Sequence, residues 1–179
     1  MRRRIEAELV RIESERSVRV LLAIESGSRA WGFPSSDSDY DVRFVYVGAL
    51  VDYLSIADRR DVIEQPIVGK LDVNGWDLRK ALQLAIGSNA VLLEWLSSPI
   101  RYRDESSLTG PLREIASATV YLPALEYHYD RMARRALAEI VDSDAPRLKS
   151  YFYALRPAVA LRWLRRVDPW RVARHGARR

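Results

Sequence analysis

The sequence predicts an α+β fold: a small mixed β-sheet with flanking helices, followed by a C-terminal helical subdomain. Strand and helix patterns alternate through residues 1–105, whereas residues 106–179 show helical periodicity alone. The 179-residue length allows one domain or two small ones, and the 48% hydrophobic content is ordinary for a packed protein. We therefore expect a mixed domain over residues 1–105 and a helical domain over residues 106–179.

The individual elements follow from the spacing of apolar residues. Ile5, Leu9 and Ile12 recur at helical intervals and predict an amphipathic helix over residues 2–15. Short apolar, β-branched runs predict strands, and longer stretches with one apolar face predict helices. The expected strands lie at 18–24, 39–47, 61–67 and 70–74, and the further helices at 78–86, 89–96, 110–119, 122–142 and 147–166. Residues 49–58 fit neither pattern.

Single residues set the ends and bends of several elements. Asn74-Gly75 predicts the end of the strand that begins at residue 70, and Asp77 is the expected N-cap of the next helix. Pro157 predicts a kink in the last helix, because it removes one backbone N–H and frees the carbonyl of Tyr153.

The composition narrows the chemical setting. The chain has no cysteine, which excludes disulfides and thiolate zinc sites and fits a reducing cytoplasm. No apolar stretch is long enough to span a membrane. The net charge is +5, and basic residues clearly outnumber acids from Arg131 onward. This asymmetry favours an anionic partner for the C-terminal part, although a solvated basic face is an equal alternative.

The most informative motif joins a small-residue turn to a pair of carboxylates. Gly27-Ser28 follows an apolar strand, and ten residues later Asp39 and Asp41 open a second strand. A Gly-Ser turn can present backbone N–H groups to a phosphate. Carboxylates two apart on a strand share one face and repel each other unless a cation lies between them. The pattern therefore predicts a site for a metal ion and a nucleotide.

A third carboxylate would complete a two-metal site of the kind used in phosphoryl transfer. Asp72 is the preferred candidate, because a strand next to the Asp39–Asp41 strand can present it to the same face. Asp77 is the alternative, although an N-cap role already explains it. The sequence from Asp37 does not favour an EF-hand loop, since Val42 and Gly48 stand where that loop needs glycine and glutamate.

These motifs resemble the DNA-polymerase-β-like nucleotidyltransferase superfamily, in which Gly-Ser or Gly-Gly precedes Asp-x-Asp by about ten residues. More narrowly, the chain is similar to the bacterial and phage branch of predicted nucleotidyltransferases linked to RNA repair. The stretches that carry this likeness are Gly27–Gly32, Ser38–Phe44, Asp72–Lys80, Asn89–Pro99, Tyr127–Tyr129, Lys149–Pro157 and Arg162-Trp163. The resemblance implies transfer of a nucleoside monophosphate from an NTP to a hydroxyl, with an RNA end as the expected acceptor.

The resemblance also assigns roles to residues. Asp39, Asp41 and Asp72 would be catalytic and hold Mg²⁺, with two ions expected, and Gly27 and Ser28 would meet the triphosphate. The further nucleotide-binding candidates are Arg29, Lys149, Tyr151 and Arg156. Base preference, template use and oligomeric state are not encoded in these motifs.

Two other readings of the same likeness remain open. A degenerate relative would bind nucleotide or RNA without chemistry, and a toxin–antitoxin type of enzyme would modify a protein. Family members continue beyond the Arg162-Trp163 helix with a further helical segment, whereas residues 167–179 depart from this pattern. On this ground we expect a helical domain cut short at its C-terminal end.

Overall fold

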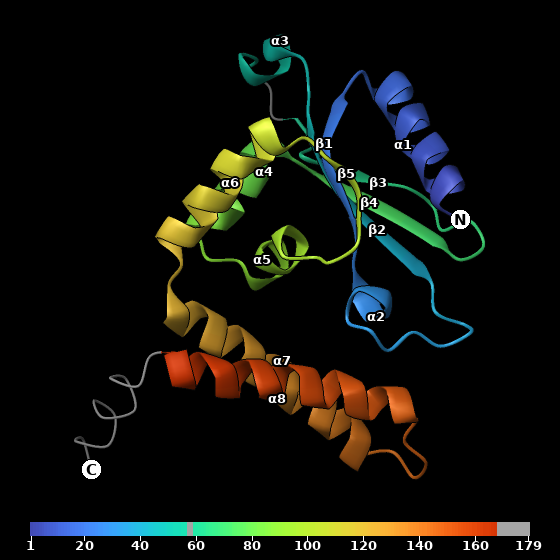
Figure 1. Cartoon of the computed structure of the whole chain (residues 1–179), viewed down its shortest axis with the longest axis vertical. Coiled ribbons are helices and arrows are strands. Elements are labelled where there is room, and N and C mark those ends of the chain that lie inside the picture. The colour runs from blue at the N-terminus through green and yellow to red at the C-terminus, as the bar shows by residue number, and fades with distance from the viewer. Residues whose placement is uncertain (57–58, 168–179) are drawn as a thin grey trace. The chain divides into compact units, whose positions relative to one another are not determined.

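A five-stranded mixed sheet forms the centre of the N-terminal part of the chain, in the strand order β3-β4-β2-β1-β5 (Figure 1). The structure is a computed structural model that describes residues 1–56 and 59–167. Its strands are β1 Arg19–Glu25, β2 Tyr40–Val47, β3 Val62–Glu64, β4 Leu71–Asp77 and β5 Arg101–Asp104. Strands β2 and β4 pair in parallel, while the β1–β2, β1–β5 and β3–β4 pairs are antiparallel.

Helices cover both faces of this sheet. The helices of this N-terminal part are α1 Arg2–Arg16, α2 Gly27–Ala30, α3 Leu50–Tyr53, α4 Leu78–Ile86, α5 Ala90–Leu96 and α6 Ser106–Thr119. The C-terminal part of the chain contains α7 Leu122–Val141 and α8 Leu148–Val167. Figure 1 shows α1 on one face and α4, α5 and α6 on the other. Along β2, Val42, Phe44 and Tyr46 join the core under α1, whereas Val45 joins the core under α4–α6. Because side chains alternate along a strand, Asp41 and Arg43 share the face of Val45.

The chain divides into two compact units, Met1–Val120 and Tyr121–Arg179. Helix α6 therefore belongs to the unit of the sheet, where it packs on α4 and its Leu112 and Ala116 join the core. The sequence pattern instead predicts residues 106–119 as part of the helical domain. In the second unit, α7 and α8 pack against each other. Among the described residues, no helix is both long and apolar enough to cross a membrane.

Most expected elements are confirmed, and the mixed α+β class is confirmed with them. Ile5, Leu9 and Ile12 are fully buried on α1, and Asp77 and Asn89 cap α4 and α5 with their side chains. Helix α6 begins at Ser106 rather than at residue 110. The kink at Pro157 stays a prediction. The expected departure over residues 167–179 lies, from residue 168 on, outside the described residues.

The prediction that Asn74-Gly75 ends a strand is wrong. Strand β4 continues through both residues to Asp77, in parallel register with β2. Gly75 lies opposite Phe44, and a Cβ atom at position 75 would come within 2.2 Å of the Phe44 ring. This glycine therefore makes room for an aromatic ring of the core, and it does not form a turn.

Candidate functional site

Asp41 and Asp72 lie directly opposite each other on the parallel strands β2 and β4. The following pairs in the same register include Arg43 opposite Asn74. Neither carboxylate is deeply buried, with side-chain exposures of 29% for Asp41 and 18% for Asp72. The sequence expectation that an adjacent strand presents Asp72 beside Asp41 is therefore met by the sheet itself.

Arg43 joins the two carboxylates. Its Nη2 donates to Asp72 Oδ2 at 2.7 Å and lies 3.3 Å from Asp41 Oδ1. The Nη1 of the same guanidinium donates to the main-chain carbonyls of Val42, at 3.0 Å, and Asp72, at 3.2 Å. Asn74 Nδ2 donates to the other Asp72 oxygen at 2.7 Å. One cation thus compensates two negative charges that would otherwise repel each other.

Gly27 brings the backbone of the preceding loop against Asp41. It has a φ of +60°, and a Cβ atom at this position would lie 2.0 Å from Asp41 Oδ2. The N–H of Ser26 donates to the Asp41 carbonyl at 2.8 Å, which fixes the end of β1 to the start of β2. Only glycine combines this backbone conformation with the close approach of a carboxylate.

Ser28 is buried, and its hydroxyl donates to Ser38 Oγ at 3.0 Å. Ser38 Oγ also accepts from the N–H of Ser35 at 2.9 Å. The Ser28 side chain thus closes the loop of residues 27–39 upon itself. Contact of Ser28 with a triphosphate stays a prediction.

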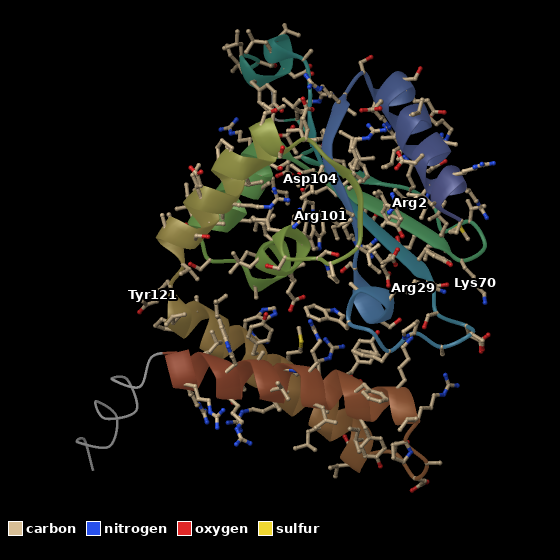
Figure 2. All side chains as sticks on the ribbon, viewed as in Figure 1. Arg2, Arg29, Lys70, Arg101, Asp104 and Tyr121 are labelled. Atoms are coloured by element: carbon tan, nitrogen blue, oxygen red, sulfur yellow. The ribbon has the colours of Figure 1, made fainter. Side chains whose placement is uncertain are left out.

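Arg29 and Lys70, both labelled in Figure 2, donate hydrogen bonds to carbonyls of the same loop. The Arg29 guanidinium stacks 3.7 Å from the centre of the Tyr40 ring and donates to the carbonyls of Ser38 and Asp39. Lys70 Nζ donates to the Ser36 carbonyl at 2.7 Å. In this arrangement Arg29 orders the loop, and its predicted role as a phosphate ligand stays a prediction.

The other two candidate carboxylates are Asp39 and Asp77, and the role of Asp39 as a metal ligand stays a prediction. Asp39 precedes β2, which begins at Tyr40, and Asp39 is exposed. Asp77 is at the far end of β4, five residues or about 16 Å along the strand from Asp72. Its carboxylate accepts from the N–H of Arg79 at 2.7 Å and from the Tyr53 hydroxyl at 2.8 Å. Asp77 is thus a helix cap, and Asp72 is the carboxylate that stands beside Asp41.

Lys149, Tyr151 and Arg156 all lie on α8, in the second unit. Lys149 Nζ is 5.7 Å from the centre of the Tyr153 ring, and Tyr151 is exposed. Arg156 Nη2 lies 3.1 Å from the sulfur of Met132 on α7. These contacts are internal to the helical unit, so their predicted role with the nucleotide stays a prediction.

Sequence reasoning missed Glu25, the last residue of β1. Its side chain is fully buried and accepts from the N–H of Asp41 at 2.9 Å and from the Tyr102 hydroxyl. Burial raises the pKa of Glu25, and these hydrogen bonds only partly oppose the effect. Glu25 therefore fixes the backbone of Asp41 from the interior. A charged residue at the end of an apolar strand was the signal available for it.

Oxygen donors of this kind suit a hard divalent cation such as Mg²⁺. Within residues 1–56 and 59–167, no three His, Cys, Asp or Glu side chains are arranged to hold a metal ion. Asp41 and Asp72 nevertheless already share one positive group, Arg43. The Asp41 and Asp72 oxygens thus fit a divalent metal ion once the Arg43 guanidinium moves away from them.

Comparison with known sequences gives the family of this protein. A family model described as RlaP, RNA repair pathway DNA polymerase beta family, matches residues 1–175, so the chain belongs to this family. The chain is also 49% identical over 164 residues to a Bacillus subtilis (strain 168) protein, "Uncharacterized protein YcgL". That match covers 92% of this chain and 63% of the relative, so the chain spans less than two thirds of the relative's length.

Proposed function

We propose that this protein is a Mg²⁺-dependent nucleotidyltransferase that transfers a nucleoside monophosphate from an NTP to a hydroxyl group. The observation that carries the proposal is the contact of Gly27 with Asp41, beside Asp72 in register on the next parallel strand. Membership of a DNA polymerase β family linked to RNA repair supports the same reaction class. In the reaction, the hydroxyl oxygen bonds to the α-phosphorus, pyrophosphate leaves and the hydroxyl proton passes to solvent.

The proposed roles of the residues follow from their positions. Asp41 and Asp72 would hold Mg²⁺, with Asp39 added from the preceding loop and two ions expected. When bound, the metal would neutralise phosphate charge and activate the attacking hydroxyl. The Gly27–Ser28 backbone faces the same carboxylate and would receive the triphosphate. Arg29 would keep the loop ordered while the nucleotide binds.

We propose an RNA end as the acceptor and the cytoplasm, where NTPs and RNA meet, as the setting. The family description names RNA repair, and the chain is basic, with a net charge of +5. Phosphate contacts by arginine and lysine would supply most of the affinity for RNA. Lys149, Tyr151 and Arg156 on α8 would contribute to nucleotide or RNA binding.

The test is incubation of the full chain with Mg²⁺ and each α-labelled NTP, with pooled RNA as acceptor. Asp41→Asn and Asp72→Asn remove the proposed metal ligands. Asp37→Asn is the matched control, because Asp37 lies in the same loop with its side chain 95% exposed. We expect label in RNA with the wild type and Asp37→Asn, and a loss of at least about 100-fold with the other two variants.

Other outcomes identify the alternatives. Label in the protein fraction of an added lysate, and none in RNA, would establish a protein acceptor. Binding of Mg²⁺ and NTP without transfer to any acceptor would contradict the enzyme and identify a nucleotide-binding module. Full activity of Asp41→Asn would show that the reaction takes place elsewhere on the chain.

A further inference from the structure

Arg43 contacts both Asp41 and Asp72 through its Nη2 atom. Its side chain is only 18% exposed, as expected for a group enclosed between two strands. The guanidinium has two different sets of partners: Nη2 meets the carboxylates, and Nη1 meets main-chain carbonyls. Nη1 is therefore anchored to the main chain, whereas Nη2 occupies carboxylate oxygens that a metal ion would also need.

We propose that Arg43 is the positioning residue of the carboxylate pair, and that a divalent cation enters this site by displacing its Nη2 end. Arg43 compensates Asp41 and Asp72 until the metal arrives, and the metal then takes over that charge. The inference rests on the proposed function, since it concerns the same two carboxylates. In this proposal, competition between the Arg43 guanidinium and the divalent metal ion sets the affinity of the protein for the metal.

The sheet, and not Arg43, fixes where the carboxylates lie. Asp41 and Asp72 are paired in the β2–β4 register, and Asn74 holds Asp72 Oδ1 independently of Arg43. The backbone at Gly27 lies close to the other oxygen of Asp41, Oδ2. Removal of the guanidinium therefore takes away a positive charge that lies next to both carboxylates and leaves their positions unchanged, so a divalent cation is attracted more strongly.

The movement that the exchange requires is small. Nη1 donates to the carbonyls of Val42 and Asp72, neither of which is a proposed metal ligand group. Arg43 keeps these bonds while Nη2 turns away from the carboxylate oxygens. The freed end stays next to the site, where its positive charge would face a bound triphosphate.

The experiment is a titration of the full chain with Mn²⁺ in the absence of nucleotide, with free Mn²⁺ followed by electron paramagnetic resonance. We expect Arg43→Gln to bind Mn²⁺ about tenfold more tightly than the wild type, a typical size for coupling between two occupants. Arg43→Lys keeps the charge but has no second donor group to stay anchored, so we expect a smaller increase. Without metal, Arg43→Gln should have a lower Tm than the wild type.

Arg113→Gln is the matched control. Arg113 is 26% exposed and pairs with Asp104, with no part in the proposed site. We expect this variant to lower the Tm and to leave the Mn²⁺ affinity unchanged. Adding Asp41→Asn to Arg43→Gln should abolish the gain in affinity, which assigns the gain to this carboxylate.

Unchanged or weaker Mn²⁺ binding by Arg43→Gln would overturn the inference, and so would absence of Mn²⁺ binding by both proteins. If Arg43→Gln does not fold, unchanged or weaker binding by Arg43→Lys overturns it equally. None of these results decides the proposed function, because nucleotide transfer is measured separately, on the wild-type protein with NTP present. Transfer without a change of metal affinity would refute only the role of Arg43.

Discussion

The contact between Gly27 and Asp41 allows a sharp prediction, because a second glycine in the same loop serves as its control. Gly27 and Gly32 both have a positive φ, +60° and +79°. A Cβ atom at position 27 would lie 2.0 Å from Asp41 Oδ2, whereas position 32 has no atom within 4 Å of such a Cβ. The loss of stability in Gly32→Ala therefore measures the cost of an alanine at positive φ alone. The loss in Gly27→Ala measures that cost together with the cost of displacing the Asp41 carboxylate.

The expected magnitudes follow from these two contributions. An alanine at positive φ costs about 1 kcal/mol, which is the whole effect at position 32. At position 27, overpacking adds about 1–3 kcal/mol, so the total is about 2–4 kcal/mol. Atoms in ordinary contact stay about 3.5 Å apart, so the Asp41 oxygen must move by about 1.5 Å. A misplacement of about 1 Å can lower the rate of an enzyme about 100-fold.

Two assays decide the matter. Urea unfolding of the wild type and both variants gives the free energies of unfolding, and the α-labelled NTP assay gives the rates of transfer. We expect Gly27→Ala to lose about 100-fold in rate and Gly32→Ala to stay within a few fold of the wild type. Equal losses of stability and rate in the two variants would refute the reasoning, because the Asp41 contact would then have no effect.

Three further predictions concern the scaffold around the site. Gly75→Ala places a methyl group within 2.2 Å of the Phe44 ring, so we expect a loss of about 3 kcal/mol in urea unfolding; a loss below about 0.5 kcal/mol would contradict this packing. Burial tends to raise the pKa of Asp104, but hydrogen bonds from Thr109 and Arg113 outweigh burial, so the pKa of this carboxyl is lowered. The ionised Asp104 carboxylate therefore stabilises the fold above the ordinary pKa of 3.8, and this stabilisation is lost as the pH falls through the lowered pKa. Asp104→Asn should therefore cost about 2 kcal/mol at pH 7 and progressively less in unfolding measurements below pH 3.8, and a constant difference would contradict this assignment. Asp77→Ala removes the cap of α4 and should cost about 1 kcal/mol by thermal unfolding, with NTP transfer retained if Asp72 is the metal ligand; loss of transfer in a folded protein would restore Asp77 as the third carboxylate.

Local periodicity predicted the elements that carry their own signal. Ile5, Leu9 and Ile12 mark the buried face of α1, and Asp77 caps α4 as its sequence position indicates. Strand β5 was missed, because Arg101–Asp104 has no apolar alternation and forms only by pairing with β1. It lies at an edge of the sheet, where pairing depends on a neighbour distant in sequence.

The end of β4 shows how tertiary packing overrides a local signal. Asn-Gly is a typical turn sequence, yet Asn74 and Gly75 lie within a strand. Gly75 makes room for Phe44, a residue on a different strand, and Asn74 donates to Asp72. Neither reason is visible without the β2–β4 register.

The same limit applies to the candidate site. The Gly27…Asp39-x-Asp41 spacing identified the region, and the structure places Asp72 beside Asp41 as expected. The contacts of Arg43 and Glu25 were missed, since each depends on a residue of a neighbouring strand. Alternation along β2 puts Arg43 on the face of Asp41, but charge alone does not tell a bridging arginine from a solvent-exposed one.

The central claim is that Asp41 and Asp72, beside Gly27, form the site for metal and NTP. Anomalous scattering from crystals of the full chain, grown with Mn²⁺ and a non-hydrolysable NTP analogue, tests it most directly. The account predicts a manganese peak in contact with both carboxylates, and phosphate density against Gly27 and Ser28. A bound nucleotide elsewhere on the chain, with Arg43 still bridging Asp41 and Asp72, would contradict it.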